Sequence, residues 1–163
     1  MKKLSLFLFV LLTATCVAQG LYYYPQLPET VPSHFSLTGE PDAEASKSIL
    51  ITIYYGVIGV LAVLFLWAGL RVPRMPAAVL NMPNKEHWMS DERQATTRAF
   101  LSSSMFWLGS ATMLLMLDVF HQSFRVGLGT VERMPHVAIS LILFVAFVMV
   151  WTLGFISRFK TLS

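Results

Sequence analysis

The side chains of this sequence that could hold a metal ion or move a proton are a few histidines and aspartates. Asp118 precedes His121 by three residues, so both side chains lie on one face of a helix. With His34, and with His136 or Asp42 nearby, they would offer imidazole and carboxylate groups to a divalent cation or a proton relay. Their spacing matches no recognised metal motif. We therefore favour a hydrogen-bonded network that fastens a loop to helix ends, with a metal at His34, Asp118 and His121 as the alternative.

These residues are positioned by long uncharged segments. The sequence has 163 residues, 55% hydrophobic and 13% charged, with a mean hydropathy of +0.62. Soluble domains carry about 25% charged residues. The uncharged runs are 4–28, 48–70, 99–117 and 136–157, and each can hold the roughly 20 apolar residues of a spanning helix. We predict an all-α membrane protein, one domain over 1–163, with four transmembrane helices at about 4–24, 48–70, 91–121 and 136–157.

The basic residues predict how these helices cross the membrane. Nine of the 12 lysines and arginines lie before the first run, after the last run, or between the second and third runs. Lys47, Arg125 and Arg133 lie on the other side. The positive-inside rule then predicts that both chain ends and the loop 71–90 are cytoplasmic, and that the loop 25–47 and a second loop at about 121–136 face outward. Because the cations flank hydrophobic runs, we predict no nucleic-acid partner.

The first run has the basic start and apolar middle of a signal peptide, and Ala18 could end a cleavage site. The run continues to Tyr24, and its aromatic end suits a membrane interface, so we favour an uncleaved signal anchor. Cys16 is the one cysteine, which excludes an intrachain disulfide. Lipidation at Cys16 is the alternative, although the residues before it fit that processing signal poorly.

The outer loop contains four prolines, which deny it a long helix. The segment "TVPSHFS" is expected to be extended, and "TGEPD" to be a turn in which Gly39 takes a positive φ. Asp42 is then placed to cap the second helix, with Glu44 in its first turn. Those assignments leave His34 without a structural reason, beyond a hydrogen bond to the loop's own backbone.

The cytoplasmic loop holds the second group of polar residues. Ser90, followed by two acidic residues, predicts the start of the third helix. Trp88 is interpreted as an interfacial anchor. The alternative is a docking surface built from Asn81, Asn84, Lys85, Glu86 and Trp88. Gly56 and Gly59, like the small residues of the third helix, are interpreted as helix-packing positions.

Both loops resemble a known family. "PQLPETVPSHFSLTGEPDAEASK" resembles the outer-loop signature of a bacterial membrane domain of unknown function that also forms the N-terminal part of SdpI-like toxin-immunity proteins. The matching positions are Pro28, Pro32, His34, Phe35, Gly39, Pro41, Asp42 and Lys47. "NMPNKEHW" followed by "SDER" is similar to a segment of short stand-alone members. The resemblance implies a multi-pass protein of the bacterial inner membrane. For SdpI-like members it also implies protection against a membrane-active peptide and help in signalling to a repressor.

From these features we expect a non-enzymatic membrane protein that binds a membrane-protein partner or a peptide, immunity-like or as an accessory subunit of a complex. No cofactor is predicted. The alternative is a metal-dependent enzyme or transporter-like protein that uses the outer histidines and aspartates. The recognition residues of the outer loop are His34, Phe35, Gly39, Asp42 and Lys47; an outer polar cluster is Asp118, His121 and His136; the cytoplasmic candidates are Asn81, Asn84, Lys85 and Trp88.

Overall fold

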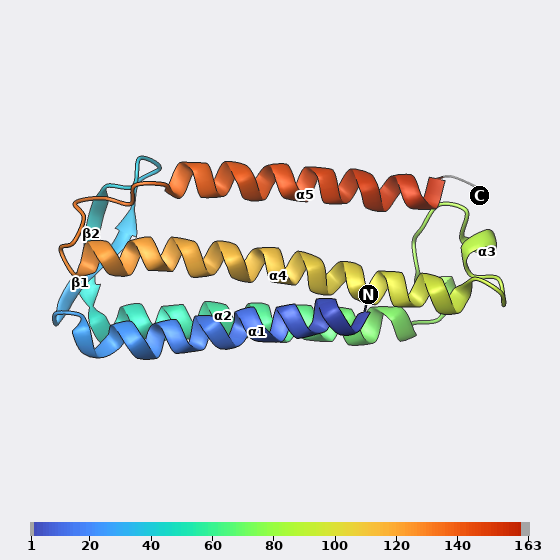
Figure 1. Ribbon diagram of the computed structural model, residues 1–163, viewed down its shortest axis with the longest axis horizontal. Helices are drawn as coiled ribbons and strands as arrows, with labels where there is room; N and C mark the ends of the chain where they lie inside the picture. The colour runs from blue at the N-terminus through green and yellow to red at the C-terminus, as the bar shows by residue number, and fades with distance from the viewer. Residues whose placement is uncertain (1, 161–163) are drawn as a thin grey trace.

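Four long helices make up most of the protein (Figure 1). The computed structural model describes residues 2–160. Within them lie α1 (Lys2–Tyr23), α2 (Lys47–Arg71), α4 (Gln94–Gly127) and α5 (Val137–Lys160). Each of the four is long and apolar enough to cross a membrane. The prediction of a mostly helical chain with four helices of membrane-spanning length is confirmed, but the fold is not all-α, because a two-stranded sheet joins α1 to α2.

Helices α1, α2 and α4 pack together around one apolar core. Tyr54 of α2 and Phe106, Met113 and Phe124 of α4 are fully buried in it, and Phe9 and Cys16 of α1 complete it. Tyr54 meets the ring of Phe124 edge-on at a centroid distance of 5.4 Å. A membrane does not drive helices together by the hydrophobic effect, so close packing of this kind must hold the three helices.

Small residues allow α2 and α4 to approach closely, but only at some positions. A Cβ at Gly69 would lie 2.4 Å from the ring of Phe106, and the Gly69 carbonyl accepts a 2.7 Å hydrogen bond from the Ser102 hydroxyl. By contrast, a Cβ at Gly56 or Gly59 would meet nothing within 4 Å. The interpretation of Gly56 and Gly59 as packing positions was therefore wrong.

Helix α5 packs differently. It lies along α4, on the side away from α1 and α2 (Figure 1). Within Val137–Lys160, Phe159 at the far end is the one buried residue. The middle of α5 thus presents apolar side chains to the surroundings, and specific contacts to this helix concentrate near its two ends.

The segment between α1 and α2 forms a β-hairpin. Strand β1 (Thr30–Phe35) pairs antiparallel with β2 (Pro41–Ser46). The helix cap is Ser46, whose hydroxyl accepts a hydrogen bond from the Ile49 amide over 3.3 Å. The prediction that Asp42 caps α2 and that Glu44 lies in its first turn was wrong, because pairing with β1 holds both residues in an extended strand.

The bounds of α4 also differ from the predicted 91–121. The Ser90 hydroxyl donates to the His87 carbonyl instead of capping a helix, and residues 91–93 form a turn before Gln94. At its other end α4 continues to Gly127, because Phe124, Val126 and Gly127 are buried there. The second predicted loop is therefore shorter, at 128–136.

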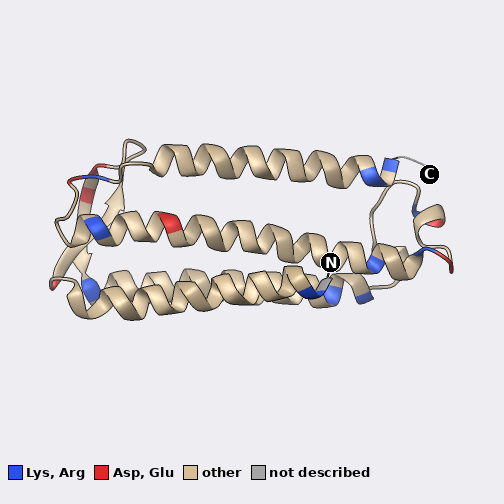
Figure 2. Ribbon diagram, in the orientation of Figure 1, with Lys and Arg blue, Asp and Glu red and all other residues tan. Residues whose placement is uncertain are grey.

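The connections gather at two opposite ends of the helix bundle (Figure 1). The hairpin and loop 128–136 form one end, which we call the hairpin end. Helix α3 (Lys85–Trp88), short 3₁₀ turns at Val72–Arg74 and Ala77–Val79, the start of α1 and the end of α5 form the other, the α3 end. Basic residues crowd the α3 end and are sparse at the hairpin end (Figure 2).

Candidate functional site

The tip of the hairpin is docked onto loop 128–136. Gly39 has φ +84°, and its amide donates to the Ser36 carbonyl over 2.9 Å, which closes the turn. The Gly39 carbonyl accepts a 2.9 Å hydrogen bond from the Met134 amide. A Cβ at Gly39 would lie 2.4 Å from the Met134 carbonyl oxygen. Gly39 therefore meets two demands, a left-handed turn and a close backbone contact.

The base of the hairpin is fastened to α1, α2 and α4. Leu27 and Val31 are buried, and both lie against Gly127 near the end of α4. Lys47, the first residue of α2, reaches back to the Glu29 carboxylate at 2.9 Å and the Leu27 carbonyl at 3.4 Å. Its ammonium also lies 5.6 Å from the centre of the Tyr24 ring. The hairpin is thus held at both its base and its tip.

His34 pairs with Asp42 across the two strands. Its Nδ1 lies 2.5 Å from Oδ1 of Asp42, and the two side chains are 71% and 49% exposed. Gly39 is buried and Lys47 is mostly covered, whereas Phe35 is half-buried. Of the five predicted recognition residues, His34 and Asp42 are the two that the hairpin presents to its surroundings.

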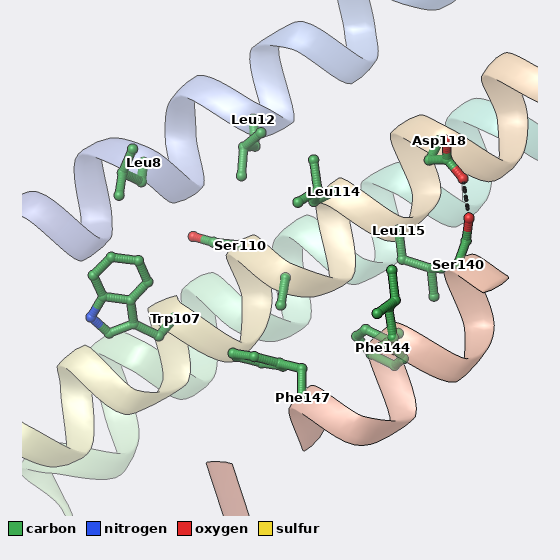
Figure 3. Close-up of a pocket in the computed structure, with 12 residues that line it drawn as sticks. Leu8, Leu12, Trp107, Ser110, Leu114, Leu115, Asp118, Ser140, Phe144 and Phe147 are labelled. Carbon is green, nitrogen blue, oxygen red and sulfur yellow. Dashed lines mark hydrogen bonds between the residues drawn. The ribbon is translucent and has the colours of Figure 1, made fainter. Parts of the chain in front are cut away.

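The predicted outer polar cluster divides into separate contacts. Asp118 Oδ2 accepts a hydrogen bond from Gln122 Nε2 at 2.7 Å. It accepts a second one from Ser140 Oγ at 2.6 Å (Figure 3). Gln122 in turn accepts a 2.8 Å hydrogen bond from the backbone amide of His136. His121 instead lies 3.0 Å, through Nδ1, from the hydroxyl of Tyr23. Asp118 and the His136 backbone therefore tie α5 to α4.

These contacts bear on the metal alternative. Within residues 2–160, no three histidine, cysteine, aspartate or glutamate side chains come together as metal ligands would. His34 is engaged by Asp42, and Asp118 by Gln122 and Ser140. The structure thus does not bring His34, Asp118 and His121 into one metal site.

Two hollows meet at Asp118. One has a volume of about 600 Å³, lies between α1, α4 and α5, and has walls that are almost entirely apolar (Figure 3). The other, of about 540 Å³, lies between α1 and α4 and includes Gln19, Tyr23 and His121. Asp118 and Leu114 line both hollows. A carboxylate thus stands where an apolar hollow meets a more polar one.

At the α3 end, the segment "NMPNKEHW" holds the end of α5. The Asn84 amide donates to the carbonyls of Phe159 and Lys160 at 3.0 and 3.2 Å, and the Trp88 indole donates to Phe159 at 3.2 Å. These carbonyls belong to the last turn of α5, where helical partners are missing. Trp88 is only 8% exposed, so its interpretation as an interfacial anchor was wrong.

The other polar residues of this loop have weaker roles. Lys85 Nζ lies 3.4 Å from the Ala78 carbonyl, and Asn81 is exposed. Asn84 and Trp88 already donate hydrogen bonds to α5, so these two side chains of the predicted docking surface are directed into the protein.

Sequence reasoning missed a polar network inside the helix core. The Tyr54 hydroxyl lies 2.5 Å from the Cys16 carbonyl oxygen and 3.0 Å from Oε1 of Gln19. Gln19 Nε2 donates to the Leu117 carbonyl over 2.9 Å, so one glutamine links all three core helices. The available signal was Gln19 itself, the one amide side chain among 4–24.

A model of a domain of unknown function (DUF1648) matches residues 10–59. The match begins within α1, covers the whole hairpin and ends near the middle of α2. No curated protein matches the chain. No solved structure matches it either. The similarity to a domain of unknown function thus falls on the docked hairpin and the two helices that carry it.

Proposed function

We propose that this chain is a non-enzymatic membrane protein that binds a partner through the exposed side of its β-hairpin. The observation that carries the proposal is Leu37, an apolar side chain that is 87% exposed at the tip of a hairpin fastened at both ends. Turns are usually made of glycine, proline, asparagine, aspartate or serine, so the turn itself does not call for leucine.

The surroundings of Leu37 suit recognition. His34 and Asp42 form an exposed pair on the same hairpin, and Glu40 lies 3.9 Å from Arg133 beside the tip. An apolar centre with polar groups around it is the usual composition of a protein interface. Because the hairpin is already ordered, a partner would not have to order this segment on binding.

We also propose that the hairpin faces outward from the inner membrane of a bacterium. Nine of the 12 basic residues belong to the α3 end, including Arg71, Lys85 and Arg158, and three belong to the hairpin end (Figure 2). The positive-inside rule places the richer end in the cytoplasm, with both chain ends there.

The partner in this proposal is a membrane protein or a membrane-active peptide. The first would make the chain an accessory subunit, and the second would give it the immunity-like role that the resemblance to SdpI-like proteins implies. The metal-dependent alternative has no comparable support among residues 2–160, where metal-ligating side chains do not gather.

The test is co-purification of the intact protein from its native membranes. Leu37→Asp is expected to remove a partner that the unaltered protein retains. Val79→Asp is the matched control, because Val79 is 66% exposed at the opposite end of the bundle. Retention of the same partner by Leu37→Asp, or equal loss with Val79→Asp, would contradict the proposal.

A further inference from the structure

Among residues 2–160, no cationic side chain forms an ion pair with Asp118. Its Oδ2 accepts two hydrogen bonds, both from the neutral side chains of Gln122 and Ser140. Within residues 2–160, Oδ1 accepts no hydrogen bond, and no lysine, arginine or histidine lies within ion-pairing distance of the carboxylate. Ionisable groups in membrane spans are normally paired, so an unpaired one marks a candidate binding site.

The depth of Asp118 is fixed by its contact with α5. Ser140 is the fourth residue of α5, so Asp118 lies level with the first turn of that helix. A 24-residue helix is about 36 Å long and a hydrocarbon core is about 30 Å thick, which places this level near the boundary between headgroups and hydrocarbon.

The two hollows at Asp118 follow one another along the bundle, with the more polar hollow nearer the hairpin end. The polar hollow contains Gln19 and Tyr22 of α1, nearer the hairpin end, while the apolar hollow contains Leu8 and Leu12, deeper in the span. A molecule filling both would have a polar end at the headgroup level and a hydrocarbon tail below it. Each hollow falls within the roughly 300–1,000 Å³ of known ligand sites.

The apolar hollow is open sideways. Leu114 of α4 and Leu143 of α5 line it and are 56% and 64% exposed, and in Figure 3 Phe144 and Phe147 of α5 stand across from Leu8 and Leu12 of α1. In a bilayer this side faces lipid. The molecule that reaches such a hollow most directly is a lipid of the leaflet at the hairpin end.

We propose that this groove binds one phospholipid with a primary ammonium headgroup, whose ammonium donates a hydrogen bond to Oδ1 of Asp118 while an acyl chain lies along α1, α4 and α5. The headgroup supplies the positive charge that residues 2–160 do not place within ion-pairing distance of Asp118. An anionic headgroup would bring like charge to the carboxylate and is disfavoured.

The test is native mass spectrometry of the whole protein, delipidated and offered equal amounts of phosphatidylethanolamine and phosphatidylglycerol. The unaltered protein is expected to retain one phosphatidylethanolamine. Asp118→Asn is close in shape but uncharged, and it should lower the ratio of bound phosphatidylethanolamine to bound phosphatidylglycerol about tenfold, the effect of losing a charged hydrogen bond.

A second variant covers the case in which Asp118→Asn does not fold. Ala111→Phe would fill the apolar hollow and should prevent retention of the lipid, while Val60→Phe on α2, 69% exposed and away from the groove, should not. Equal retention of both lipids by the unaltered protein would overturn the proposal. An unchanged ratio of the two bound lipids in Asp118→Asn would also overturn it. A lipid-free dimer would overturn it as well, and would assign the groove to a second copy of the chain.

Discussion

The Gly39 carbonyl oxygen and the Met134 amide, 95 residues apart in sequence, are joined by a 2.9 Å hydrogen bond. This contact connects the tip of the hairpin to the loop between α4 and α5. Because α5 is otherwise held mainly at its ends, the contact makes the hairpin a part of the structure that positions α5. The match to a domain of unknown function ends before α4, so that partner segment lies outside the matched residues.

Gly39→Ala should destabilise the protein more than Gly129→Ala. Both glycines have positive φ, so both variants carry a strain of about 1–2 kcal/mol. Only the Cβ at position 39 would meet a neighbour, the Met134 carbonyl, whereas nothing lies within 4 Å at position 129. The measurement is the thermal unfolding midpoint of each variant in the same detergent. Equal midpoints would show that the Gly39–Met134 contact adds nothing to stability.

Trp88→Phe should loosen the end of α5. The ring packing is largely kept, but the indole donor to the Phe159 carbonyl is lost, at a cost of about 1 kcal/mol in the free energy of unfolding. Hydrogen exchange of the amides near Phe159, read by mass spectrometry, should become faster. Trp67→Phe is the control, because Trp67 is 52% exposed on α2. Faster exchange in both variants, or in neither, would refute this role.

Gly69→Ala and Gly56→Ala should have opposite effects. At Gly69 the new methyl group would collide with Phe106 and separate α2 from α4, at a cost of about 1–3 kcal/mol. At Gly56 it enters open space, and alanine favours a helix by about 0.5–1 kcal/mol over glycine. Thermal unfolding in detergent distinguishes the two, and a loss of stability in Gly56→Ala would point to an unseen neighbour at that face.

The orientation of the bundle can be read from labelling in intact cells. Cys16 is buried, so it should contribute little background to labelling by a membrane-impermeant maleimide. A cysteine placed at the exposed Thr38 should react in intact cells, whereas one placed at Val79 should react only after the cells are opened. The reverse pattern would place the hairpin in the cytoplasm and remove the basis for an outward recognition surface.

The sequence was sufficient for the parts of the fold that depend on local composition. Long uncharged runs predicted four helices, and "TGEPD" predicted the positive φ at Gly39. The predicted span 48–70 agrees with α2, but its cap was wrongly assigned to Asp42 because "PDAEAS" contains good capping and helix-forming residues. Its pairing with β1 is a tertiary contact that overrides those local preferences.

The site depended on contacts between distant segments, which local patterns do not specify. The metal alternative grouped His34 with Asp118, but Asp42 lies closer along the hairpin and pairs with His34. The partners of Asp118, in contrast, are Gln122 on its own helix and Ser140 on the next. Ser140 offered no signal in the sequence, because a serine inside an apolar span usually bonds to its own helix.

The measurement that tests the binding role most directly is photocrosslinking from position 37 in native membranes. A photoreactive amino acid replaces Leu37 in the intact chain, and the same residue replaces Val79 as the control. We predict one discrete adduct from position 37 and none of that mass from position 79. The adduct should be lost when His34 and Asp42 are both changed to alanine. No adduct from position 37, or an adduct unaffected by those two substitutions, would contradict a recognition role for the hairpin.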